Sequence, residues 1–182
     1  MEKQIKIGAV AKVIHKNRLI RRVGLDSDVI ISLIDDSKQF SLFKPKIYNR
    51  RNLLFINYRV FSELLGHFIY NKKLKKDQAV NKIFDYIRKN NIYLLKKKDT
   101  DMKKVSDTIT ILKKQRETLD NNAGDKDLEI ISVYKFHDID LIFSRNSDDF
   151  EPFCKYLGIA FEKLQEDINT MWKQVFGWRK KR

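Results

Sequence analysis

Carboxylate side chains stand beside apolar runs at four separated places in the chain. The first segment carries Asp26 and the second Glu63, while the third carries Asp125 and Asp127 and the fourth Asp148 and Asp149. Carboxylates brought together without a cation repel one another, whereas Mg²⁺ and Mn²⁺ are hard ions that prefer oxygen ligands. Such an ion lowers the pKa of a bound water and stabilises charge that develops on a phosphate. If the fold brings the acids together, we expect a Mg²⁺ or Mn²⁺ site that acts on phosphate esters.

Each acid taken singly also has a purely structural interpretation. Asp28, Asp125 and Asp127 stand where a helix N-cap or first-turn acid contributes about 0.5–2 kcal/mol. Glu63 alone is typical of a solvated helix position, and the acids of SRNSDDF are typical of a turn. Residue type and position therefore leave capping and metal binding both open.

Strand-like and helix-like patterns alternate along the chain and must position these acids. We expect buried strands at 21–26, 52–58, 91–96 and 139–144, although 52–58 is also compatible with the entry to a helix. We expect helices at 29–36, 59–70, 77–89, 101–119 and 128–136, the first of them capped by Ser27 or Asp28. This alternation predicts an α/β fold with a central parallel sheet between helices in three layers. Functional groups then gather at the carboxyl ends of the strands, where Asp26 and SRNSDDF stand.

The last part of the chain predicts a further helix. Its apolar stripe consists of Phe161, Leu164, Ile168, Met171 and Val175. This stripe either packs on the protein's own core or binds a partner, which includes a second copy of the chain in a homodimer. The basic tail GWRKKR follows it.

Composition indicates one globular domain with a polyanionic partner. The 182 residues carry 42% hydrophobic side chains and a formal charge of +14. This charge favours nucleic acid first and an anionic membrane surface second, the alternative being a merely lysine-rich surface. The single cysteine, Cys154, excludes an internal disulfide. Lysines interrupt the apolar residues near the N-terminus and no run reaches about 20 apolar residues, so we expect a cytoplasmic protein without a membrane partner.

Other sequence features carry less chemistry. His15, His67 and His137 lack the spacing of a metal site, and neither G-x-G-x-x-G nor a P-loop occurs. Basic runs stand at 72–76, 96–98 and 179–182. They are either solvated surface or a track for phosphates, and we select Lys72, Lys73 and Arg145 as candidate nucleic-acid contacts.

Four motifs in order resemble those of the PIN-domain nucleases. LDSDVII is similar to that family's first motif, and VFSELL resembles its second, an acid on the helix after the second strand. DLEIISVYKF and DLIFSRNSDDF resemble the third and fourth. The match covers residues 22–157 of one PIN-like domain, with an N-terminal extension at 1–21 and a C-terminal helix and basic tail at 158–182.

The resemblance implies catalytic roles for particular residues. The metal-ligating and catalytic acids would be Asp26, Glu63, Asp127 and Asp149. Three further residues would support those acids: Asp28, Ser144 and Asn146. Asn146 stands where many family members have an acid, Ser144 replaces the usual threonine, and Asp28 falls where the family often has Asn or another small polar residue.

The function implied by the resemblance is a metal-dependent endoribonuclease. VapC-like members of the family are toxins neutralised by a small antitoxin, and other members process RNA. Two alternatives stay open: a catalytically weak or inactive PIN-like protein that binds RNA or a partner, favoured by Asn146, and a DNA nuclease.

Overall fold

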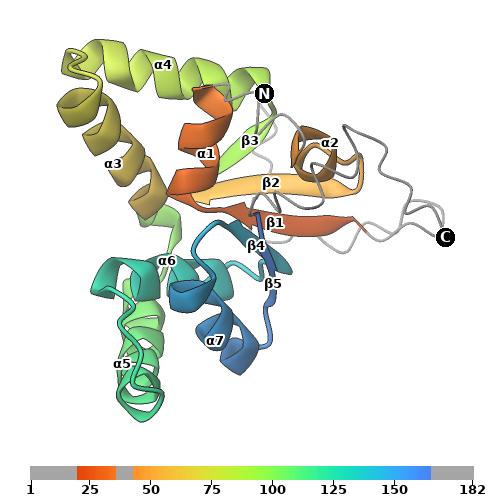
Figure 1. The fold of residues 1–182 in the computed structure, drawn as a ribbon, viewed down its shortest axis with the longest axis vertical. Helices are drawn as coiled ribbons and strands as arrows, with labels where there is room; N and C mark the ends of the chain where they lie inside the picture. The colour runs from red at the N-terminus through yellow and green to blue at the C-terminus, as the bar shows by residue number, and fades with distance from the viewer. Residues whose placement is uncertain (1–19, 36–42, 165–182) are drawn as a thin grey trace, which may run out of the picture.

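Five parallel strands form one sheet in the computed structural model, which describes residues 20–35 and 43–164 (Figure 1). Their order across the sheet is β3-β2-β1-β4-β5. The strands are β1 (Arg21–Leu25), β2 (Asn52–Asn57), β3 (Ile92–Leu95), β4 (Leu141–Ser144) and β5 (Ala160–Lys163). The central strands β2 and β4 contain continuous apolar runs because helices cover both faces of a parallel sheet.

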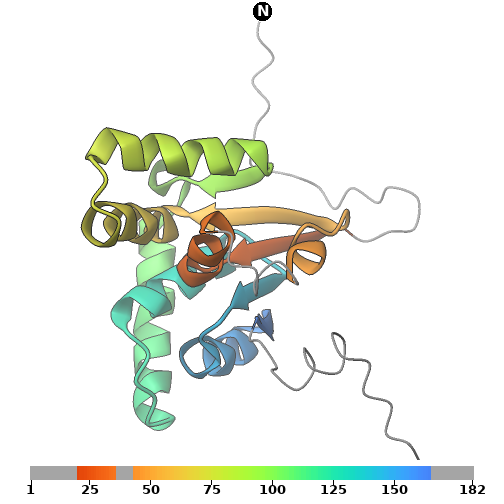
Figure 2. The ribbon, with the colours of Figure 1, turned by 45° about the horizontal axis from the view of Figure 1, so that its top comes forward.

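The helices divide into two groups on opposite faces of the sheet. They are α1 (Ser27–Ile34), α2 (Lys44–Ile47), α3 (Tyr58–Gly66), α4 (Lys76–Lys89), α5 (Met102–Thr118), α6 (Asp125–Phe136) and α7 (Ser147–Leu157). The chain runs from β1 to β2 and β3 on one side of β1, and then returns to β4 and β5 on the other side. Because the direction across the sheet reverses at this return and each crossover is right-handed, the two sets of helices lie on opposite faces. Helices α1, α3 and α4 pack together on one side, and α5, α6 and α7 pack together on the other (Figures 1 and 2). The predicted three-layer α/β/α fold is confirmed.

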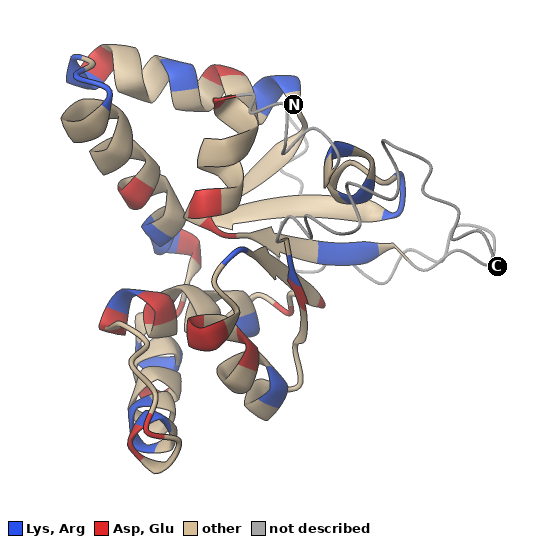
Figure 3. Cartoon of the chain, in the orientation of Figure 1, with Lys and Arg blue, Asp and Glu red and all other residues tan. Residues whose placement is uncertain are grey.

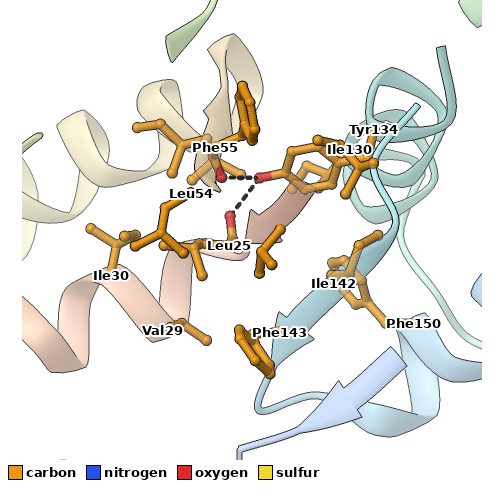
Figure 4. Packing of buried hydrophobic residues seen from close by; sticks show 14 of the residues in the cluster. Leu25, Val29, Ile30, Leu54, Phe55, Ile130, Tyr134, Ile142, Phe143 and Phe150 are labelled. Carbon is orange, nitrogen blue, oxygen red and sulfur yellow. Dashed lines mark hydrogen bonds between the residues drawn. The ribbon is translucent and has the colours of Figure 1, made fainter. Parts of the chain in front are cut away.

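The core between β1 and α6 has no room for a side chain at Gly24. A Cβ atom there would lie 2.8 Å from Cε2 of Tyr134, whose ring is fully buried. The Tyr134 hydroxyl donates to the carbonyl oxygens of Leu25, at 2.6 Å, and Phe55, at 3.3 Å (Figure 4). This tyrosine thereby ties helix α6 to the neighbouring strands β1 and β2.

The start of the first helix differs from the prediction. We expected Ser27 or Asp28 as its N-cap, but Asp26 is the N-cap and its carboxylate accepts a hydrogen bond from the backbone N–H of Ser27. The strand therefore ends one residue earlier than predicted, at Leu25. Asp26 combines a capping role with its place at the strand end, two roles that the sequence had presented as alternatives.

Two elements near the end of the described chain were also predicted wrongly. The segment SRNSDDF begins helix α7 and is not a turn, because Asn146 caps that helix and its pattern continues through Pro152. The predicted C-terminal helix is wrong for residues 160–163, which form β5 beside β4. Gly158, with a φ of 70°, ends α7 in the left-handed conformation and turns the chain onto the free edge of β4. The rest of the predicted apolar stripe, at 168–175, lies outside the described residues.

The helices formed by the described residues include none that is long and apolar enough to cross a membrane.

Candidate active site

The predicted acids lie around the carboxyl ends of β1 and β4, where the strand order reverses. Ligands of open α/β sheets bind at such a switch point because the connections leave neighbouring strands toward opposite faces. Figure 3 shows acidic segments of α1, α3, α6 and α7 at the end of the sheet from which α1 and α3 leave. We call these residues the acidic cluster: Asp26, Asp28, Glu63, Asp127 and Asp149.

Asp26 is the most buried member of the cluster, with 5% of its surface exposed. Its backbone N–H donates to the Phe143 carbonyl at 3.0 Å, which fixes the end of β1 against β4. Its Oδ1 accepts from the Ser27 N–H at 2.7 Å, and its Oδ2 accepts from the Ser144 hydroxyl at 2.7 Å. Both carboxylate oxygens are therefore held in fixed directions by groups from two different strand ends.

Burial raises the pKa of Asp26 to about 8, and the nearby Asp28 carboxylate adds to this shift. The hydrogen bonds from Ser144 and Ser27 favour the ionised form but do not reverse the effect of burial, and the Glu63 carboxylate raises the pKa further. A cation at this position would remove the electrostatic cost of ionising Asp26.

The two oxygens of Asp28 have different surroundings. Oδ2 accepts from the backbone N–H of Arg145 at 3.1 Å, whereas Oδ1 is buried without a hydrogen-bond partner. Burial raises the pKa of Asp28. The Arg145 guanidinium donates to the Ser32 hydroxyl at 3.2 Å, so the β4–α7 connection is attached to α1 at two points.

The first turn of α6 separates two acids that were equivalent in the sequence. Asp125 is exposed and pairs with Lys113, at 2.6 Å, and with Arg116, at 3.0 Å. These cations lower its pKa. Asp127 is half-buried and accepts from the Gly124 N–H at 3.0 Å, while burial and the carboxylates of Asp149 and Glu63 raise its pKa. Asp127 therefore caps the helix and also belongs to the acidic cluster, whereas Asp125 does not.

Asn146 and Ser144 organise the start of α7. Asn146 is the N-cap: its Oδ1 accepts from the Asp149 N–H at 3.3 Å, and its amide N–H donates to the Asp149 carboxylate. The Ser144 hydroxyl is buried, accepts from the Asn146 N–H at 3.0 Å and donates to Asp26. A chain of hydrogen bonds thus runs from Asp149 through Asn146 and Ser144 to Asp26.

Asn57 is a positioning residue that the sequence analysis missed. It is fully buried at the end of β2, and its Oδ1 accepts from the N–H groups of Arg59 and Val60, both at 3.0 Å. Its Nδ2 donates to the Ile130 carbonyl of α6 at 3.1 Å. One side chain therefore fixes the start of α3, which carries Glu63, against the helix that carries Asp127. An Asn directly before an apolar helical pattern is a recognisable N-cap signal that could have identified it.

A second link between α3 and α6 runs through Glu129. The Tyr58 hydroxyl donates to Glu129 Oε1 at 2.8 Å, and Arg59 Nε lies 3.4 Å from Glu129 Oε2. Burial, with the Glu129 hydrogen bond and charge, raises the pKa of Tyr58, so its hydroxyl remains a donor. These contacts restrict the movement of α3 relative to α6.

The acids interact electrostatically but do not form a closed set of ligands. Glu63 raises the pKa values of Asp26, Asp28 and Asp127, and Asp149 raises that of Asp127. Across residues 20–35 and 43–164, however, no three acidic, His or Cys side chains are close enough to hold a metal as they stand. The donor chemistry fits a hard divalent cation, because the cluster offers only carboxylate oxygens and one of them is buried without a partner.

The three predicted nucleic-acid contacts occupy different places. Arg145 adjoins the acidic cluster through Asp28. Lys72 pairs with Asp35 at 2.9 Å, beyond the opposite end of α1, a helix that is about 12 Å long at 1.5 Å per residue. Lys73 follows it with a φ of 58°. The structure therefore places only Arg145, of these three, beside the cluster.

Comparison with solved structures identifies the fold. No family model matches the sequence, and no curated protein sequence matches it significantly. VapBC2 from Rickettsia felis, bound to a promoter DNA fragment, contains a chain that is 16% identical, with a TM-score of 0.61 over 79% of this chain and 99% of that chain. DNA-bound VapBC from Salmonella typhimurium is 14% identical, with a TM-score of 0.57 over 79% of this chain and 98% of that chain.

FitAcB from Neisseria gonorrhoeae is also similar, at 13% identity and a TM-score of 0.52 over 76% of this chain and 95% of that chain. Identities this low establish the fold alone. The chain shares its fold with chains of these VapBC and FitAcB complexes, which agrees with the fold that the resemblance to PIN-domain nucleases implied.

Proposed function

We propose that this chain is a metal-dependent endoribonuclease of the VapC kind. Asp26, Glu63, Asp127 and Asp149 would together hold Mg²⁺ or Mn²⁺. The observation that carries the proposal is the burial of Asp26 at the switch point of the sheet, which raises its pKa to about 8, with further contributions from the carboxylates of Asp28 and Glu63. A fold that needed only a helix cap there would not require additional acids from three other helices.

A bound divalent cation would supply charge stabilisation for a phosphodiester and lower the pKa of a water. The residues of the chain perform the positioning. Ser144 and the Ser27 N–H orient the two oxygens of Asp26, while Asn57 holds the Glu63 helix against the Asp127 helix. These directing groups belong to strand ends and helix starts, and the acidic side chains would have to move from their present positions to place their oxygens on one cation.

Single-stranded RNA is the substrate that we infer. The formal charge of +14 attracts a polyanion without reading its sequence, and the Arg145 guanidinium is close enough to Asp28 to lower the pKa of that carboxylate. Affinity for RNA should therefore decrease with increasing salt. A DNA nuclease is the alternative in the same chemical class, and a PIN-like protein that binds RNA without cleaving it is the alternative outside that class.

We further infer a protein partner of the antitoxin type and a cytoplasmic location. The similar solved structures are toxin–antitoxin complexes, two of them bound to DNA. Half-buried apolar side chains on α1, α3 and α4, together with exposed Phe84, provide a surface for such a partner or for a second copy of the chain. Chromatography of the purified protein, alone and with a co-expressed neighbouring gene product, would separate a homodimer from a heteromeric complex.

Cleavage of labelled RNA tests the enzymatic proposal. Purified protein is incubated with single-stranded RNA, or DNA of the same sequence, in Mn²⁺ or EDTA, beside Asp26→Asn and Asp149→Asn. Asp125→Asn is the matched control because this acid shares the α6 first turn but pairs with Lys113 and Arg116 outside the cluster. We expect Mn²⁺-dependent RNA cleavage by the wild type and by Asp125→Asn only. Equal cleavage by wild type and Asp26→Asn, or none with Mn²⁺, contradicts the proposal, and preferential cleavage of DNA favours the alternative nuclease.

A further inference from the structure

Asp28 has one carboxylate oxygen with no partner among the described residues. Its Oδ2 accepts from the Arg145 N–H at 3.1 Å, but its Oδ1 is buried and accepts no hydrogen bond. Burying a carboxylate oxygen without a compensating donor costs free energy, and it costs more when the group is ionised. The structure therefore contains an unsatisfied acceptor one residue beyond the Ser27 N–H that holds Asp26.

Charges of both signs act on Asp28: the Arg145 guanidinium lowers its pKa, and the Glu63 carboxylate raises it. Among the charged groups near Asp26, the Asp28 carboxylate raises the pKa of Asp26 most. The Glu63 carboxylate raises the pKa of both Asp26 and Asp28. The nearest cation, Arg145, directs its Nη1 to the Ser32 hydroxyl. Capping does not explain the placement, because Asp26 already caps α1.

The resemblance to PIN-domain nucleases does not require an acid at this position either. The corresponding residue is often Asn or another small polar side chain, and an Asn could accept from the Arg145 N–H without adding charge. Asp28 therefore adds, in the first turn of α1, a negative charge that the family motif does not demand. The Asp28 carboxylate thereby adds an oxygen atom that could bind a cation beside Asp26.

We propose that Asp28 Oδ1 is an additional anionic donor for the divalent cation bound at Asp26, so that five carboxylates form this site. The inference rests on the proposed function and extends it to a residue outside the four family positions. A cation would give Oδ1 the partner it lacks and would reduce the repulsion between Asp28, Asp26 and Glu63. The same charge that is unfavourable in the metal-free protein thereby increases affinity for the cation.

Two measurements on the intact chain test this role without RNA. Mn²⁺ alone is titrated into wild type, Asp28→Asn, Asp26→Asn and Asp148→Asn, with free Mn²⁺ followed by electron paramagnetic resonance. Thermal unfolding is then recorded in EDTA and in Mn²⁺. Asp148→Asn is the matched control, because this exposed acid stands next to Asp149 and its removal changes the net charge equally.

We expect Asp28→Asn to weaken Mn²⁺ binding about tenfold or more, the usual loss on removing a group that supports a metal site, and Asp148→Asn to leave it nearly unchanged. We also expect Asp28→Asn to unfold at the same or a higher temperature than wild type in EDTA, yet to gain less from Mn²⁺. A purely structural role predicts the opposite effect in EDTA.

The other outcomes separate the inference from the proposed function. The role of Asp28 is overturned if Asp28→Asn binds Mn²⁺ as wild type does, or if Asp148→Asn weakens binding as much as Asp28→Asn does. In either case, loss of Mn²⁺ binding in Asp26→Asn would still support the proposed metal site. If wild type binds no Mn²⁺, both are overturned.

Discussion

Replacing Asp26 by Asn should stabilise the metal-free protein at neutral and alkaline pH, although it should abolish cleavage. The side chain is 5% exposed, and burial beside Asp28 raises its pKa from 3.8 to about 8. Asn cannot ionise, and its Oδ1 can still accept from the Ser27 N–H. Its Nδ2 can donate to the Ser144 hydroxyl, whose oxygen has a second lone pair beside the one used by Asn146.

The pH dependence follows from proton binding in the two states. Between the unfolded pKa of 3.8 and the folded pKa of about 8, the folded protein retains a proton at Asp26 that the unfolded chain has lost. The stabilisation from this raised pKa is therefore fully present below pH 3.8 and is lost as the pH rises to 8. At about 1.4 kcal/mol per pH unit, the wild type loses on the order of 4 kcal/mol between pH 4 and pH 7 from this residue.

Urea denaturation in EDTA measures the difference between wild type and Asp26→Asn. The two proteins should have similar free energies of unfolding near pH 4, and Asp26→Asn should be the more stable by about 4 kcal/mol at pH 7. Mg²⁺ or Mn²⁺ should then stabilise the wild type by about 3 kcal/mol at 100 times its dissociation constant, but should not stabilise the variant. A variant that is less stable than wild type at pH 8 in EDTA, or a stability difference that does not grow with pH, would refute the reasoning.

Four further changes test the packing and contacts around the site, each by urea denaturation. Asn57→Ala should destabilise the fold by about 2 kcal/mol or more, because it removes a cap and leaves buried backbone N–H groups unsatisfied; no loss would contradict the assigned role. Gly24→Ala should cost about 1–3 kcal/mol through contact with the Tyr134 ring, whereas Gly66→Ala, with no atom within 4 Å of its new Cβ, should stabilise helix α3 by about 0.5–1 kcal/mol. Glu129→Gln should cost under about 1 kcal/mol, since its ion pair is partly exposed; a larger loss would show that this pair holds the two helices together.

The sheet and most helices could be predicted because their signals are local. Apolar runs that end at polar residues define β1, β2, β3 and β4, and the apolar spacing after β1, β2 and β3 defines the helices that follow them. The short strand β5 could not be predicted in this way. Its four residues Ala160–Lys163 have no alternation of burial, and their conformation depends on the free edge of β4, which is distant in sequence. The helix α7 was missed because Pro152 and the paired acids of its first turn resemble a loop.

The acids of the site could be selected from the sequence, but their different surroundings could not. Asp125 and Asp127 are two residues apart and equally suited to a helix start, yet one pairs with cations from α5 and the other faces the carboxylates of Asp149 and Glu63. That difference arises from packing between helices, which no local pattern contains. The buried partners of the acids, Asn57 and Ser144, are likewise defined by contacts across strand ends.

At position 26, the residue that would be best for stability differs from the residue that the proposed function requires. As a cap it would be replaced by Asn or Ser without loss, and as a buried acid with a pKa of about 8 it weakens the metal-free fold at neutral pH. A residue that lowers stability where a neutral residue of equal size would fit indicates a functional requirement. Asp28 extends this reasoning by one position, because its unpartnered oxygen adds a second unfavourable charge on the same side. A bound cation would turn both costs into a favourable interaction, which supports the proposed metal-dependent chemistry.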